Sequence, residues 1–154
     1  MRISPIIVRH DTQMAHMIAN RTTLKKLQSE WAGVVKMREK MENLVKMTFS
    51  TGGLTGPSLA KVLYNLPMLL AFDVLAQVLR AARDEGTFVS RGDKPGKLMD
   101  SAKTALTWND WGELKDGVLR RNEIAHDGKL FDSSQCLKDI TKVQEQLVAW
   151  AIIE

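Results

Sequence analysis

The chain has 154 residues, of which 44% are hydrophobic and 26% charged, and its formal net charge is +4. A chain of this length and composition usually folds around one hydrophobic core, so we expect a single domain over residues 1–154. One cysteine excludes an internal disulfide, and no group of cysteines and histidines has zinc-ligand spacing, so neither a metal nor another cofactor is expected.

The N-terminal stretch MRISPIIVRHDTQ has an apolar patch that is too short for a signal peptide and lacks a cleavage site. No run approaches the roughly 18 apolar residues of a membrane span. We therefore expect a cytoplasmic protein without a membrane partner. The positive net charge shifts the balance slightly toward a polyanionic partner such as RNA.

Apolar residues recur at spacings of three and four between residues 12 and 49, which predicts one long amphipathic helix with a break near Asn20 as an option. Arg38 falls on the apolar stripe of this helix. The simpler interpretation is that the Arg38 side chain extends from the edge of the stripe into solvent. The alternative is that Arg38 belongs to a second-rank functional site.

Residues 50–58, STGGLTGPS, contain three glycines and Pro57, which cannot continue the helix. Pro57 suits the first turn of a following helix, because its missing N–H costs nothing there. The apolar pattern then predicts a second helix to about Glu85, kinked by Pro67. Nearly all faces of this segment are apolar, which indicates a central helix.

Residues 86–96, GTFVSRGDKPG, are polar, basic and rich in glycine and proline, which predicts a loop between the two halves of a helical bundle. The segment GDKPGK lacks the earlier glycine and the following Ser or Thr of a phosphate-binding loop. We interpret it as a basic surface loop, in which Arg91, Lys94 and Lys97 are candidate RNA-contacting residues.

A third helix is predicted in two pieces. The first begins near Lys97 and the second at Trp108, where Thr107 and Asp110 have the spacing of a capping box. Gly128 suits the left-handed position that ends many helices.

Residues 132–135 provide a cap for the last helix, whose apolar stripe runs from Leu137 through Val148 to Ala151. No alternating β pattern of any length occurs. The predicted fold is therefore all-α, an antiparallel bundle of four main helices with the third helix split. The four tryptophans fall at helical spacings, which favours core or dimer-interface positions over stacking on bases.

The segment LRRNEIAHDGK, residues 119–129, places arginine, asparagine and histidine within two helical turns. At about 100° per residue, Arg121 and Asn122 fall on the packed face of the helix, whereas Arg120 and Glu123 point toward solvent. Arg121 therefore needs a partner inside the fold, because an unpaired buried polar group costs roughly a few kcal/mol.

His126 lies five residues after Arg121, or about 140° round a straight helix. We expect the chain to bend at Asp127 and Gly128 so that the imidazole turns toward the cleft of Arg121. Asn122, four residues before His126, is expected to orient the imidazole by a hydrogen bond. His10, His16 and Cys136 receive no role.

An imidazole can take a proton from an RNA 2′-hydroxyl or give one to the leaving 5′-oxygen, and a guanidinium matches phosphate oxygens. This pair suits metal-independent phosphodiester cleavage. One histidine cannot be base and acid in the same step, so a two-fold homodimer is expected to supply the second. The spacing of Arg121 and His126 alone has a simpler explanation than catalysis. Positively charged side chains and histidine near a helix C-terminus interact favourably with the helix dipole.

The segment RNEIAHDG, residues 121–128, resembles the signature of the HEPN superfamily, in which arginine is followed after four to six residues by histidine. A polar residue, often asparagine, follows the arginine, and the motif closes the third long helix, as here. The resemblance implies a HEPN-like fold of four to five helices, a homodimer and a metal-independent endoribonuclease that leaves a 2′,3′-cyclic phosphate. It would make Arg121 and His126 catalytic and Asn122 a supporting residue.

Members of this superfamily serve as toxins paired with antitoxin proteins and in phage defence, so the resemblance adds an antitoxin protein as a candidate partner. Gly128 stands where the subgroup paired with minimal nucleotidyltransferase antitoxins has a tyrosine, which argues against that subgroup. Three hypotheses follow: a dimeric ribonuclease, a non-catalytic HEPN-like module that binds nucleotide, RNA or protein, and a plain helical bundle whose motif caps a helix.

Overall fold

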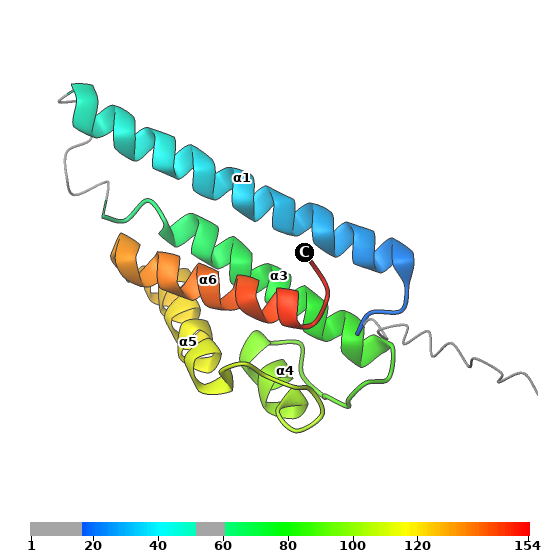
Figure 1. Cartoon of the computed structure of the whole chain (residues 1–154). Helices are drawn as coiled ribbons and strands as arrows, with labels where there is room; N and C mark the ends of the chain where they lie inside the picture. Colours follow the sequence, from blue (N-terminus) through cyan, green and yellow to red (C-terminus); the bar gives the residue numbers. More distant parts are fainter. Residues whose placement is uncertain (1–16, 52–60) are drawn as a thin grey trace, which may run out of the picture.

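The computed structural model describes residues 17–51 and 61–154, and this part of the chain is helical without any strand. Its helices are α1 (Arg21–Thr51), α3 (Asn65–Asp84), α4 (Pro95–Ala102), α5 (Trp111–Asp127) and α6 (Ser133–Ala149). The all-α prediction is confirmed. Figure 1 shows α3 in the middle, with α1 along one side and α4, α5 and α6 on the other.

The long first helix begins at Arg21, so the break considered near Asn20 is the start of α1. The side chain of Asn20 accepts a hydrogen bond from the backbone N–H of Thr23 at 3.1 Å. The Glu85 carboxylate accepts from the N–H groups of Ala19 and Asn20 at 2.8 and 2.9 Å. These bonds satisfy donors at a helix start and join it to the end of α3. The part of the predicted helix at residues 12–16 lies outside the described residues.

The central helix α3 begins at Asn65, later than the sequence pattern predicted. Pro67 therefore lies in the first turn, where its missing N–H breaks no helical hydrogen bond, and the predicted kink was wrong. The predicted restart at Pro57 lies outside the described residues. By length and composition α3 is apolar enough to cross a membrane, so the prediction that no segment approaches a membrane span was wrong. Most of that stretch is buried against the other four described helices, as expected of a central core helix.

Two helices, α4 and α5, follow the loop where two helical pieces were predicted, but the second begins at Trp111 instead of Trp108. Asp110 is the N-cap, and its carboxylate accepts from the backbone N–H of Glu113 at 2.9 Å. Thr107 is not a cap, because it lies in the connection to α5, where its carbonyl accepts from the Trp150 indole at 2.8 Å. A tertiary contact with the end of α6 thus overrides the local capping pattern.

The turn between α5 and α6 was predicted correctly at both of its ends. Gly128 has a left-handed backbone with φ of 65°. Asp132 caps α6 by accepting from the N–H of Gln135 at 2.9 Å. Buried Asn65 of α3 clamps the backbone of Phe131 with two hydrogen bonds, one donated to its carbonyl at 2.7 Å and one accepted from its N–H at 2.9 Å.

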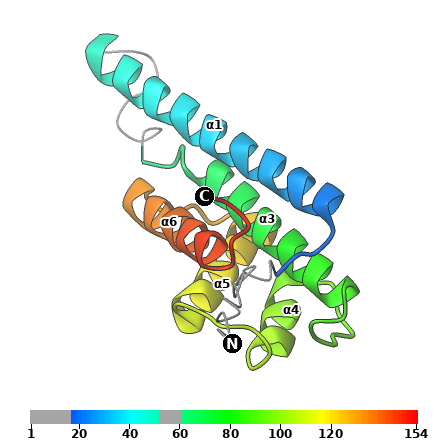
Figure 2. The ribbon, with the colours of Figure 1, turned by 45° about the vertical axis from the view of Figure 1, so that its right-hand side comes forward.

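The predicted apolar stripe of α6 was partly wrong, because Val148 is exposed. The face of α6 that packs on α3 and α5 instead buries Cys136, Asp139, Ile140, Val143, Gln146 and Leu147. Beyond α6 the chain turns back toward α1 (Figure 2), and the Gln28 amide donates to the carbonyl of buried Ile152 at 3.0 Å.

The four tryptophans all belong to the core or pack against it, as predicted. The rings of Trp108 and Trp150 meet edge to face, with 4.8 Å between their centroids. Their indole N–H groups donate to the carbonyls of Ala102 and Thr107, respectively, so neither ring is free to present its polar edge to a ligand.

The crossing of α3 and α5 depends on Gly117. A Cβ added there would overlap the Cζ of buried Phe72 and lie 3.1 and 3.2 Å from its two neighbouring ring carbons. Gly117→Ala is therefore expected to lower the free energy of unfolding by about 1–3 kcal/mol, because the ring has no room to move. Chemical denaturation measures this change.

Gly112→Ala on the same helix is the matched control, because the added Cβ would lie 3.7 Å from the nearest atom, Asp110 Oδ1. Its expected effect is neutral or stabilising by up to about 1 kcal/mol, since alanine is the better helix former. Equal destabilisation by Gly112→Ala and Gly117→Ala would show that close packing on Phe72 is not the cause.

Candidate functional site

Arg121 lies on the face of α5 that packs toward α3, where the sequence placed it. Its side chain is 20% exposed, and its Nη2 donates to Asp73 Oδ1 of α3 at 2.7 Å. The predicted need for a partner inside the fold is thus met by Asp73. Its Nη1 makes only a long hydrogen bond of 3.4 Å to Asn122 Oδ1, and its buried Nε has no partner. The guanidinium therefore has donor capacity that the described part of the chain does not use.

His126 is exposed in the last turn of α5, with no hydrogen bond or ion pair within the described residues. α5 continues through Asp127, and only Gly128 leaves the helical conformation. The imidazole therefore keeps its helical position, about 140° round the axis from Arg121, and the expected turn toward Arg121 is not made. Asn122 is bonded to Arg121, so its expected hydrogen bond to His126 is also not formed.

Arg120 was predicted to be a solvated charge, and this was wrong. Its Nε and Nη2 donate to the two carboxylate oxygens of Asp139 on α6, both at 2.7 Å. The Asp139 side chain is only 4% exposed and also accepts from Gln135 Nε2 at 3.2 Å. The hydrogen bond to Asp139 holds the pKa of Arg120 above its ordinary value. Arg120 thus joins α5 to α6 and does not belong to an open site.

Cys136 is buried beside this ion pair. Burial, with a smaller contribution from Asp139, raises the pKa of the Cys136 thiol to about 12. The thiol is therefore protonated at neutral pH, and it is not a ready nucleophile. No group of three or more His, Cys, Asp or Glu side chains that could hold a metal ion occurs in residues 17–51 and 61–154.

Arg38 is half-buried on α1 and has no hydrogen bond or ion pair within the described residues. Its charge acts on Tyr64, the residue before α3, whose pKa is raised mainly by burial and slightly lowered by Arg38. No described contact joins Arg38 to Arg121, so the two candidate sites remain separate.

Two of the three candidate RNA-contacting residues of the basic loop line a common groove, and the third does not. Arg91 and Lys97 line one groove, of about 500 Å³, between the loop and α4. Lys94 is the residue before α4 and is not part of the groove lining. All three side chains are exposed.

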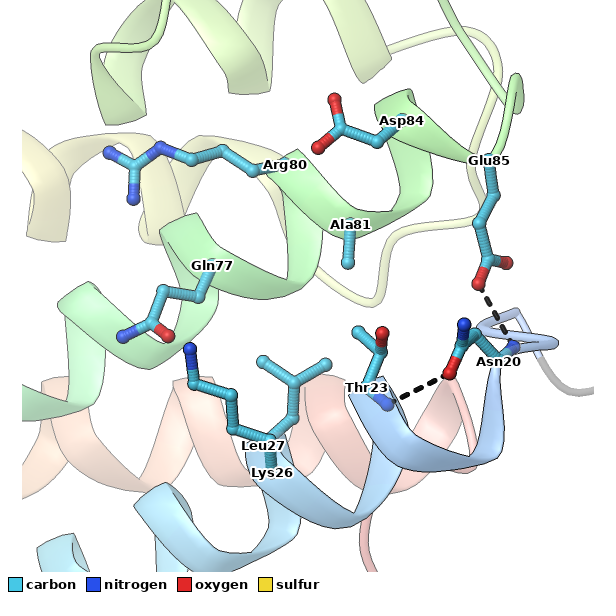
Figure 3. Close-up of a pocket in the computed structure, with 9 residues that line it drawn as sticks. All are labelled: Asn20, Thr23, Lys26, Leu27, Gln77, Arg80, Ala81, Asp84 and Glu85. Atoms are coloured by element: carbon cyan, nitrogen blue, oxygen red, sulfur yellow. Dashed lines mark hydrogen bonds between the residues drawn. The ribbon is translucent and has the colours of Figure 1, made fainter.

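A second open pocket, of about 380 Å³, lies where the start of α1 meets the end of α3 (Figure 3). Lys26 and Arg80 are balanced there by Asp84 and Glu85, and Glu85 is already bonded to the backbone at the start of α1. This pocket therefore has no excess charge or reactive group, and we interpret it as a structural junction.

Comparison with protein-family models, with curated proteins and with solved structures finds no match for this chain. The resemblance of residues 121–128 to the HEPN signature stays a prediction. The geometry relevant to it is that of α5, with Arg121 paired to Asp73 and His126 exposed at the helix end.

Proposed function

We propose that this chain is a metal-independent endoribonuclease of the HEPN type that acts as a homodimer. The observation that supports it most is the state of the two motif residues on α5. Arg121 is held by Asp73 through Nη2 while its Nη1 makes only a long hydrogen bond of 3.4 Å, and His126 is exposed without a hydrogen bond or ion pair in the described part of the chain. In this proposal residues 1–154 form a HEPN-like helical domain, an antiparallel bundle whose third helix is split into α4 and α5.

The proposed reaction transfers the phosphate ester within the RNA. One His126 imidazole takes the proton of a 2′-hydroxyl, whose oxygen forms a bond to phosphorus while the bond to the 5′-oxygen breaks. His126 of a second copy gives a proton to the leaving 5′-oxygen, which leaves a 2′,3′-cyclic phosphate. Arg121 stabilises the charge on the non-bridging oxygens, as guanidinium groups do in phosphate recognition.

The homodimer is part of the proposal for a chemical reason. A single chain supplies one His126, and that imidazole lies about 140° round α5 from its own Arg121. Two copies related by a two-fold axis can place the His126 of one chain near the Arg121 of the other. A role as a toxin or phage-defence effector in the cytoplasm, with an antitoxin protein as partner, completes the proposal.

The test is an RNA cleavage assay with the purified full-length chain in excess EDTA. We expect cleavage to continue, because no step uses a metal ion, and we expect products that end in a 2′,3′-cyclic phosphate. An RNA with 2′-O-methyl groups throughout should stay intact, because it lacks the attacking hydroxyl. Absence of cleavage under all conditions, or cleavage that EDTA abolishes, would contradict the proposal.

A second candidate is a non-catalytic HEPN-like module that binds nucleotide, RNA or protein. It is favoured by the separation of about 140° round α5 between Arg121 and His126 and by the absence of a hydrogen bond between Asn122 and His126, because a single described chain then assembles no catalytic pair. For this candidate, Arg121→Ala should weaken RNA binding while no cleavage is observed. Unchanged RNA binding would remove RNA as its ligand.

A further inference from the structure

The groove between the basic loop and α4 combines cationic, hydroxyl and apolar side chains. Its volume is about 500 Å³, and its lining consists of Val89, Ser90, Arg91, Gly92, Lys97, Asp100 and Ser101. Val89 is 88% exposed, so its apolar surface is open to a ligand. The groove thus offers two positive charges beside an apolar surface.

The acidic side chains near this groove are already paired with other cations. Asp93 accepts from Arg83 Nη1 at 2.5 Å, and this hydrogen bond lowers the pKa of Asp93 below its ordinary value. Asp100 accepts from Lys115 Nζ at 2.8 Å. Arg91 and Lys97 have no acidic partner within the described residues. Their two charges are therefore not cancelled by the protein, and an anionic ligand would pair with them.

The loop is held in place by two arginines of α3. Arg80 Nη2 donates to the carbonyl of Asp93 at 2.9 Å, and Arg83 Nη1 donates to the carbonyl of Gly92 at 3.5 Å. The Ser90 hydroxyl donates to the same Gly92 carbonyl at 3.1 Å. These bonds fix the backbone that carries Arg91, so little conformational entropy needs to be lost when a ligand binds.

Gly92 positions Lys97 in this groove. A Cβ added to Gly92 would lie 3.0 Å from Cδ and 3.3 Å from Cβ of Lys97. The aliphatic stem of Lys97 therefore packs across the turn because residue 92 lacks a side chain. Lys97 thus lines the same groove as Arg91.

We propose that this groove binds the phosphate backbone of single-stranded RNA through Arg91 and Lys97, with Val89 beside the sugar or base. The proposal deepens the proposed function, on which the choice of RNA rests, by assigning a second contact for the same substrate. Lys115, which bonds Asp100 of the groove, lies within about 20° of Asn122 and of His126 on the surface of α5. His126 is about 16 Å further along that helix, so one strand can reach from the groove to the motif.

The experiment measures binding of a fluorescent 2′-O-methyl oligoribonucleotide by anisotropy, because that ligand cannot be cleaved through a 2′-hydroxyl. We expect the double variant Arg91→Ala/Lys97→Ala to bind at least about tenfold more weakly, with a shallower salt dependence, because two phosphate contacts are lost. Gly92→Ala should show a smaller loss, because it displaces Lys97 without removing its charge.

Lys94→Ala is the matched control for the single variants Arg91→Ala and Lys97→Ala, because each removes one positive charge and Lys94 lies outside the groove. Its binding should fall by less than about twofold if the groove is a defined site. Wild-type binding by the double variant, or an equal loss in Lys94→Ala, would overturn the proposal. The anisotropy ligand cannot be cleaved, so this measurement reports groove binding without any contribution from catalysis, and loss of cleavage and loss of groove binding are distinguishable.

Adenosine monophosphate at equal ionic strength distinguishes a strand from a free nucleotide. A strand that contacts both Arg91 and Lys97 should resist displacement by one phosphate group at matched phosphate concentration. Full displacement would assign the groove to a free nucleotide and overturn the assignment to RNA. Circular dichroism and thermal melting of every variant should match the wild type, because the substituted side chains are exposed or small.

Discussion

His126→Ala is expected to reduce the rate of RNA cleavage by about 10²–10⁴-fold, the usual contribution of a general acid or base. The fold should be unaffected, because the imidazole is exposed and makes no hydrogen bond or ion pair within residues 17–51 and 61–154. The measurement is the initial rate of cleavage in EDTA, together with the melting temperature of each variant.

The chain offers a chemically matched control, because it has three histidines. His10→Ala and His16→Ala remove the other two imidazoles, to which the sequence assigns no role, and their rates should match the wild type. If His126→Ala keeps full activity, the assignment of the motif as a catalytic site is refuted. Mixed dimers of wild-type and His126→Ala chains should also be impaired, because the proposed reaction needs one imidazole from each copy.

Asp139→Ala is expected to give the largest loss of stability, about 3–5 kcal/mol, because it leaves the guanidinium of Arg120 without its carboxylate in a mostly buried position. The two bonds of 2.7 Å between Arg120 and Asp139 would be lost, together with the contact from Gln135. Urea denaturation at neutral pH measures the difference in the free energy of unfolding.

Asp73→Ala is the control for this prediction, because it breaks the other arginine pair of α5. The Asp73 side chain is 45% exposed, so water can solvate Arg121 after the change, and the expected cost is below about 1 kcal/mol. Replacing both Arg120 and Asp139 with methionine and leucine should restore much of the lost stability, since no buried charge then remains. Equal effects of Asp139→Ala and Asp73→Ala would mean that burial of the pair is unimportant.

Much of the helical layout could be predicted from the sequence, because apolar periodicity and breaker residues act locally. Gly128 and Asp132 were identified as helix ends from their own chemistry, and the structure confirms both. Thr107 and Pro67 were misjudged because their roles depend on partners or helix starts elsewhere in the chain. The indole of Trp150, 43 residues after Thr107, donates to the Thr107 carbonyl. A local capping pattern contains no information about this distant contact.

The candidate site was predictable only in part for the same reason. A helical wheel placed Arg121 on the packed face and indicated that it needs a partner, but nothing in α5 itself indicates that Asp73 is that partner. The role of Arg120 was missed because Asp139 sits on α6. A usable signal existed, since Asp139 lies three residues after Cys136 and four before Val143, on the stripe that α6 buries.

The two hydrogen bonds between the Asn65 side chain and the Phe131 backbone restrict the length of the connection between α5 and α6. Both polar atoms of the Asn65 carboxamide are bonded to Phe131, Nδ2 to its carbonyl at 2.7 Å and Oδ1 to its N–H at 2.9 Å. An inserted residue between Gly128 and Phe131 would move the Phe131 backbone out of reach and leave the buried Oδ1 of Asn65 without its donor, while Nδ2 would keep its bond to the Val62 carbonyl. The connection beside His126 is therefore a loop in which natural insertions should be poorly tolerated, although it is short and mostly exposed.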